Sequence, residues 1–178
     1  YATEGGVRAP LIIAGPDIAP ATIASPAMVS DLAPTLLDWV SAPAAPADAK
    51  PITGRSLLPV LRGEADTVYG PDDIRAIEVS GNSALFKGDY KITRSMPPMG
   101  DAQWALFNIK TDPGETTDLS ATLPDVLADL KAEYAGYAAA NGVLEKPEGY
   151  NSAEAVAKNS TPRFYQHNRH IMINAAIV

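Results

Sequence analysis

The spacing of hydrophobic residues predicts a small sheet in the middle of the chain. From Asp73 onward, apolar residues lie in short runs that are separated by turn-forming residues, as is typical of β-strands. Gly88-Asp89 has the composition of a two-residue hairpin turn, so neighbouring runs are expected to pair as antiparallel strands. The four predicted strands are Ile74–Val79, Ala84–Lys87, Tyr90–Arg94 and Gln103–Asn108.

A helical spacing follows this predicted sheet. Pro124 suits the first turn of a helix, and Asn141-Gly142 is typical of a helix end. Between them, apolar residues recur every three or four positions and form one face, which consists of Leu127, Leu130, Tyr134 and Tyr137. We expect this helix to cover one face of the small sheet.

The first third of the chain contains its most apolar run, Leu11-Ile12-Ile13. Consecutive apolar residues place side chains on both faces of a strand, so this run predicts a buried strand that ends at Gly15-Pro16. No second run of this kind occurs in the chain. We therefore expect the strand to complete a sheet that another piece of polypeptide supplies.

Two helices are predicted after this strand. The first begins near Ser30 and has Pro34 in its first turn. It carries an apolar face, which is expected to lie on the same sheet. This face is made by Val29, Leu32 or Ala33, Leu36, Leu37 and Val40. The second is short, with Ser56 as its cap and Gly63 as its end. The fold class is thus α/β, with an α+β arrangement in the C-terminal part.

Three segments are expected: 1–64 as the end of a larger domain, 65–145 as the small sheet with its helix, and 146–178 as a C-terminal arm. The arm ends in the apolar run Ile171–Val178, which favours packing on the parent protein or on a second subunit in a homo-oligomer. The alternative is a frayed tail without a function.

Composition narrows the possible partners. The net charge of -7 argues against nucleic acid and anionic membranes, because both require clustered Lys and Arg. The absence of cysteine excludes a disulfide framework and a thiolate metal site in this chain. No apolar run is long enough to span a bilayer, and the residues do not assign a compartment, either bacterial cytoplasm or periplasm.

Four sequence blocks carry a resemblance to a known family. They are Glu4-Gly5-Gly6-Val7-Arg8-Ala9-Pro10; Ser30-Asp31-Leu32-Ala33-Pro34-Thr35-Leu36-Leu37-Asp38; Gly54-Arg55-Ser56-Leu57-Leu58; and Leu106-Phe107-Asn108 with Asp112-Pro113-Gly114-Glu115-Thr116. In this order they resemble the C-terminal part of an arylsulfatase-type sulfatase of the alkaline phosphatase superfamily. The structural motif positions are Glu4, Gly5, Gly6, Arg8, Asp31, Pro34 and Thr35.

The resemblance implies hydrolysis of a sulfate monoester by a parent enzyme that uses formylglycine and calcium or another divalent cation. Formylglycine is made from the first residue of a Cys/Ser-x-Pro-x-Arg motif, and Ser41-Ala42-Pro43-Ala44-Ala45 lacks the arginine. The resemblance implies cation ligands that include an Asp-Asp pair, and Asp72-Asp73, the only such pair in the sequence, is interpreted as a solvated turn instead. The family's catalytic histidines have no counterpart, because the only histidines, His167 and His170, lie in the tail. The chain is therefore expected to be inactive alone and to need an N-terminal catalytic portion as its partner.

The resemblance also places a sulfate-contacting lysine just upstream of Tyr1, which makes Tyr1, Ala2 and Thr3 candidates for the rim of the substrate pocket. Arg8 and Asp31 are charges inside apolar blocks, and we expect either that they pair or that each caps local backbone or faces solvent. The cationic residues of the predicted hairpin, Lys87, Lys91 and Arg94, are interpreted as a solubilising surface rather than as an attractor of anionic substrate.

Two other functions stay open. The first is a phosphonate monoester or phosphodiester hydrolase of the same superfamily, which shares the logic of the nucleophile. The second is a non-catalytic oligomerisation or binding module, in which self-association covers the apolar run Leu11–Ile13.

Overall fold

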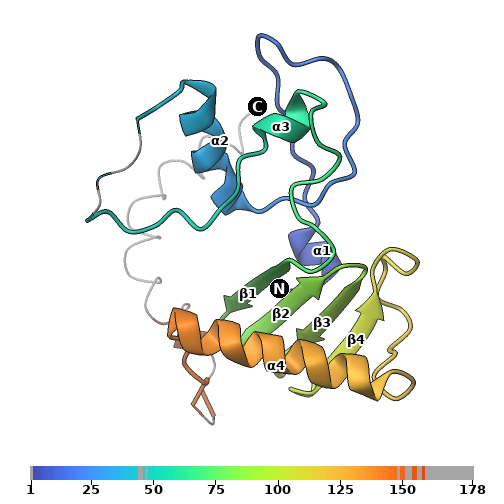
Figure 1. The fold of residues 1–178 in the computed structure, drawn as a ribbon. Coiled ribbons are helices and arrows are strands. Elements are labelled where there is room, and N and C mark those ends of the chain that lie inside the picture. Colours follow the sequence, from blue (N-terminus) through green and yellow to red (C-terminus); the bar gives the residue numbers. More distant parts are fainter. Residues whose placement is uncertain are drawn as a thin grey trace, which may run out of the picture. The chain divides into compact units, whose positions relative to one another are not determined.

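Four antiparallel strands form a sheet with the order β1-β2-β3-β4 (Figure 1). The structure is a computed structural model that describes residues 2–43, 46, 48–147, 149–150, 154–155 and 158. The strands are β1 (Ile74–Val79), β2 (Asn82–Lys87), β3 (Tyr90–Arg94) and β4 (Trp104–Asn108). The small antiparallel sheet predicted from the sequence is thus confirmed.

Tight turns set the register of this sheet. Ser80-Gly81 joins β1 to β2, and both residues have a positive φ, 56° and 86°, as a two-residue hairpin turn requires. This turn lets β2 begin at Asn82, two residues before the predicted start at Ala84. Gly88-Asp89 joins β2 to β3, as expected, with Lys87 opposite Tyr90.

Helix α4 (Pro124–Asn141) covers one face of the sheet, as predicted (Figure 1). It ends at Gly142, whose φ of 65° is the left-handed conformation that glycine adopts without strain. Leu130 and Tyr134 of α4 are buried against Leu85, Ile92 and Leu106 of the sheet. The Tyr134 hydroxyl also donates a hydrogen bond of 2.8 Å to Ser83 Oγ, so the polar atom of this buried ring is satisfied.

The opposite face of the sheet is covered by the N-terminal segment. Residues that alternate with the α4-facing ones, Ala84 and Phe86, pack with Ala2 in a second buried cluster, to which Val7 also contributes. Glu4–Val7 forms the single helical turn α1. Both faces of the small sheet are therefore buried, one by α4 and the other by a segment more than 70 residues away in sequence.

The strand predicted over Leu11–Ile13 is corrected by the structure. The Glu4-Gly5-Gly6 entry is helical, and residues 8–15 form no strand. Leu11 is exposed, and 90% of the Ile12 surface is accessible. A strand needs the hydrogen bonds of a neighbouring strand, and no described strand pairs with this run.

The two predicted helices of this region are present. A 3₁₀ turn, η1 (Val29–Asp31), leads into α2 (Leu32–Trp39), and α3 (Leu58–Leu61) is followed by Gly63 with a φ of 73°. However, the apolar face of α2 is not buried by the described residues, because Val29, Leu36, Leu37 and Val40 are all exposed.

The chain divides into two compact units, Tyr1–Val143 and Leu144–Val178. The predicted boundary near residue 64 remains a prediction. Most of the predicted arm, including its apolar end and both histidines, lies outside the described residues.

Leu130→Ala should lower the free energy of unfolding by about 2–5 kcal/mol, because it leaves a cavity between α4 and the sheet. Leu144→Ala is the matched control, since Leu144 is 85% exposed, and it should change stability by less than about 0.5 kcal/mol. Urea unfolding of the 178-residue chain measures both. Equal losses for the two variants would contradict the packing of α4 on the sheet.

Candidate functional site

Lys91 is the most deeply buried charge on the α1 side of the sheet. Its side chain is 0% exposed, and Nζ lies 2.8 Å from Glu4 Oε1 and 2.7 Å from Glu115 Oε1. The same Nζ lies 4.8 Å from the centre of the Phe86 ring, within the range of a cation–π contact. The interpretation of Lys91 as a solubilising surface residue is therefore wrong, because two carboxylates replace the water that the ammonium loses.

The other two cations of the hairpin are more accessible. Lys87 pairs with Glu133 of α4 at 2.8 Å, and hydrogen bonding to this carboxylate raises the pKa of Lys87. Arg94 lies over the ring of Trp104, 5.2 Å from its centre. Both residues therefore have contacts within the fold in addition to any effect on solubility.

Glu115 connects this ion pair to the backbone of α1. Its Oε2 accepts a hydrogen bond of 2.8 Å from the backbone N–H of Glu4, which is one of the unpaired donors at the start of the helix. Glu115 is held in a left-handed conformation, with a φ of 54°. The turn before it is fixed by Asp112, whose pKa is lowered mainly by the backbone N–H of Thr117. The turn at Asp112-Pro113-Gly114 thus presents Glu115 to Lys91, a role that the sequence did not indicate.

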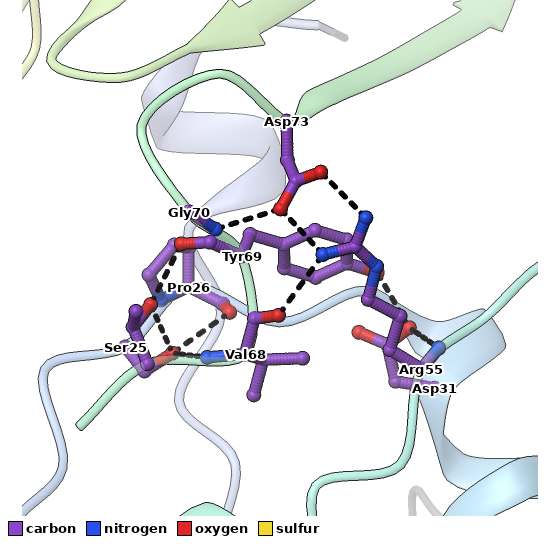
Figure 2. A network of polar contacts seen from close by, with 9 residues as sticks. Ser25, Pro26, Asp31, Arg55, Val68, Tyr69, Gly70 and Asp73 are labelled. Carbon is purple, nitrogen blue, oxygen red and sulfur yellow. Dashed lines mark hydrogen bonds and ion pairs between the residues drawn. The ribbon is translucent and has the colours of Figure 1, made fainter. Parts of the chain in front are cut away.

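Asp31 is the centre of a second polar network (Figure 2). Its carboxylate is 0% exposed and accepts hydrogen bonds from Met28 N, Arg55 N and the Tyr69 hydroxyl, at 2.6, 2.8 and 2.6 Å. Burial raises the pKa of Tyr69, and the hydrogen bond to Asp31 raises it further. Three donors therefore compensate the buried Asp31 charge, and no cationic side chain of the described residues forms an ion pair with it.

The expected pairing of Arg8 with Asp31 is wrong. The Arg8 side chain is 64% exposed, and its ion-pair partner is Glu4, one helical turn away at 3.9 Å. Asp31 instead satisfies local backbone, which is the alternative that the sequence left open. Tyr69, which no motif indicated, supplies its side-chain partner.

Two of the sequence blocks meet at this network. Thr35 Oγ1 donates to Asp31 O at 2.6 Å and accepts from Leu57 N at 2.8 Å. A side chain on Gly54 would lie 2.1 Å from the carbonyl oxygen of Ser30, so only glycine allows the two backbones to come this close. The blocks that begin at Ser30 and Gly54 are therefore one structural unit, with Pro34 in the first turn of α2.

Arg55 extends this network toward β1. Its guanidinium forms a two-point ion pair with Asp73 and stacks on the Tyr69 ring, 4.9 Å from the ring centre (Figure 2). The hydrogen bonds from Arg55 are the main reason that the pKa of Asp73 lies below its ordinary value. Asp73 is thus part of the fold and not a purely solvated turn residue.

A cleft of about 410 Å³ lies beside α1, on the second face of the sheet. Thr3 and Gly5 line one side of this cleft. Gly6 is exposed and is not among the residues that line it. Thr3, a predicted rim residue, therefore does border a cleft. The other predicted rim residues differ: Ala2 is buried in the core, and Tyr1 lies outside the described residues.

No group of three or more His, Cys, Asp or Glu side chains among the described residues has the geometry of a metal site. The part of the chain that the structure describes thus offers no cluster of three carboxylates to a calcium ion. None of its helices has the length and apolar character that crossing a membrane requires.

Lys91→Met should lower the free energy of unfolding by about 3–5 kcal/mol, because it leaves two carboxylates buried without a cation. Lys110→Met is the matched control: Lys110 is 70% exposed and pairs with Asp89 at 3.1 Å, so it should cost less than about 1 kcal/mol. Adding Glu4→Gln and Glu115→Gln to Lys91→Met should recover part of the loss. A Lys91→Met variant as stable as Lys110→Met would refute the buried pairing.

Asp73→Asn should destabilise the chain at neutral pH and have a smaller effect in acid. The folded state lowers the pKa of Asp73, so its ion pair stabilises the fold above the unfolded-state pKa of about 3.9 and is lost as the pH falls through the folded value. Urea unfolding between neutral and acidic pH should show the two stabilities converging. Asp72→Asn is the control, since Asp72 accepts no hydrogen bond from a described residue, and a parallel convergence there would contradict the assignment.

Proteins similar to this chain include a sulfatase. The chain is 29% identical over 161 residues to an uncharacterized sulfatase of Schizosaccharomyces pombe, a match that covers 84% of the chain and 28% of that protein. The chain thus spans little more than a quarter of the curated relative. No family model matches it.

Two solved structures share the fold at 20% sequence identity. One, from a study of the metabolism of multiple glycosaminoglycans by Bacteroides thetaiotaomicron, matches 60% of this chain and 24% of its own with a TM-score of 0.50. The other, Ps i-CgsB, matches 80% of this chain and 31% of its own with a TM-score of 0.53. The resemblance indicated by the four sequence blocks is confirmed: the chain is similar to a sulfatase over most of its length and is consistent with the C-terminal part of a larger one.

Proposed function

We propose that this chain is the C-terminal part of an arylsulfatase-like enzyme that hydrolyses sulfate esters. The observation that carries the proposal is the match to a sulfatase over 84% of the chain, although the chain spans only 28% of that protein. The sequence blocks that resemble a sulfatase support the same proposal, and their residues also make contacts that hold the fold together. Glu4 forms an ion pair with Lys91, Asp31 accepts a hydrogen bond from Tyr69, and Glu115 accepts one from Glu4 N.

The chemistry of this proposed enzyme belongs to its N-terminal catalytic portion. The 178 residues contain no Cys/Ser-x-Pro-x-Arg motif, so the formylglycine nucleophile would come from outside this chain. The calcium ion that the resemblance implies would also be held by that portion. The role proposed for this chain is to form one border of the substrate site, at Tyr1 and Thr3, and to support it through Glu4 and Lys91.

The surface for the catalytic portion is proposed to be the exposed apolar part of the N-terminal third. Leu11, Ile12, Leu36 and Val40 are all exposed in this chain. Covering a Leu, Ile or Val side chain is worth about 1.5–3 kcal/mol, so a catalytic portion that covers these four side chains would gain several such contributions. This exposed apolar surface supports the proposal that the catalytic portion binds here.

The 178-residue chain alone should not hydrolyse 4-nitrophenyl sulfate, whereas the parent enzyme that contains it should. Release of 4-nitrophenolate measures this, with and without added calcium. Rates for 4-nitrophenyl phenylphosphonate and bis(4-nitrophenyl) phosphate in the same assay test the sulfate preference.

Three results would change the proposal. Metal-dependent sulfate hydrolysis by the purified chain alone would overturn its inactivity. A parent enzyme that prefers the phosphonate or the phosphodiester would be the alternative hydrolase. A stable homo-oligomer of this chain, with no catalytic portion in the parent protein, would favour the binding module.

A further inference from the structure

The cleft beside α1 is built from residues of four separate segments. Its floor is the α1-facing side of β3 and β4, where Thr93, Ala105 and Phe107 lie. Thr3 and Gly5 border it at α1, and Gly114 and Glu115 border it at the turn after β4. The connection between β3 and β4 closes the remaining side. A volume of about 410 Å³ lies within the range of small-molecule sites.

Several hydrogen-bonding groups in this cleft are not used by the fold. The Ser95 hydroxyl, the Gln103 amide and the Thr3 hydroxyl make no hydrogen bond to any described residue. Asp101 uses one carboxylate oxygen, Oδ1, to accept from Gln103 N at 2.9 Å, and its Oδ2 has no such partner. Together these groups offer donors and acceptors around a single cleft, which suits a ligand with several hydroxyl groups.

The charge of the cleft selects among such ligands. None of the described residues that line it is cationic, and Asp101 and Glu115 both carry carboxylates. Lys91 lies beneath it but is already paired with Glu4 and Glu115. An anionic group in this cleft would therefore meet like charge without a compensating cation.

The apolar surface of the cleft is small. Phe107 is only 8% exposed, and Ala105 adds no more than a methyl group to the lining of the cleft. A flat aromatic or steroid ligand would gain little from such a floor. A ring with one apolar face and several hydroxyl groups fits better.

We propose that this cleft binds a neutral, polyhydroxylated ring of the size of one monosaccharide, through Ser95, Asp101 and Gln103. This ring is the alcohol part of the sulfate ester, a statement that rests on the proposed function. The carboxylates make the cleft a specificity-determining site, because they exclude alcohols that carry a uronic acid or a second sulfate group at this position.

Binding can be measured on the 178-residue chain itself by ¹H–¹⁵N NMR. The probes are the methyl glycosides of glucose, galactose, mannose, fucose and N-acetylglucosamine, with methyl glucuronide as the anionic counterpart. At least one neutral glycoside should shift the backbone amides of Thr3, Ser95 and Gln103, and methyl glucuronide should bind about tenfold more weakly or not at all. Absence of shifts at these amides for all neutral glycosides, or equal binding of the glucuronide, would overturn the proposal.

Variants at exposed positions separate binding from folding. Gln103→Ala should weaken the neutral glycoside about tenfold, the loss expected for one hydrogen-bonding side chain. Asp101→Asn keeps an oxygen for Gln103 N and should narrow the gap between glucoside and glucuronide. Asp129→Asn, on the exposed side of α4, is the matched control, and a change there equal to that of Asp101→Asn would refute local selection by charge.

The parent enzyme distinguishes this inference from the proposed function. Gln103→Ala should lower kcat/KM for a neutral monosaccharide sulfate relative to 4-nitrophenyl sulfate, mainly through KM. A parent enzyme that hydrolyses neither ester overturns the sulfatase proposal and leaves the NMR result for the cleft standing. A parent enzyme whose ratio of the two rates is unchanged by Gln103→Ala overturns the role of the cleft in choosing the alcohol.

Discussion

The structure depends on one buried cation. Lys91 lies between Glu4 and Glu115, so three segments that are far apart in the sequence meet at a single ammonium group. A buried ion pair is weak evidence for net stability, because desolvation opposes the attraction between the charges. The role of this ion pair is to fix the position of α1. One oxygen of Glu115 pairs with Lys91, and the other accepts a hydrogen bond from the first N–H of α1. Glu115 thereby also positions Thr3 and Gly5, which flank Glu4. The same contacts therefore hold the α1 border of the cleft next to the turn that carries Glu115.

The Asp31 network follows the same physical logic with different chemistry. A carboxylate without accessible surface is satisfied by two backbone N–H groups and one phenol hydroxyl, and the backbones on either side come close enough to require Gly54. Arg55 then connects this unit to the start of β1 through Asp73. Sequence blocks that are 20 or more residues apart are thus parts of one hydrogen-bonded assembly.

Prediction from sequence succeeded where local pattern decides the structure. The strands and α4 were recognised because alternation, hairpin turns and the Asn141-Gly142 end are local features. It failed where a distant partner decides: the ladder that Leu11–Ile13 would need is absent from the described strands. Lys91 and Tyr69 were missed for the same reason, since a lysine on a strand and a tyrosine in a loop show no sign of their carboxylate partners until the fold brings them together. Thr3 was placed near a pocket by resemblance, whereas Gln103 and Asp101 belong to no motif.

The close approach of Gly54 to Ser30 also has a consequence for how this region can vary in length. Thr35 and Asp31 fix the chain on both sides of the connection between α2 and Gly54, which makes that connection a closed loop with anchored ends. Doubling the length of such a loop costs only about 0.6 kcal/mol in closure entropy. Insertions or fusion partners between Trp39 and Gly54 should therefore leave the anchors in place, and this connection is the natural point at which to attach a label or an additional domain.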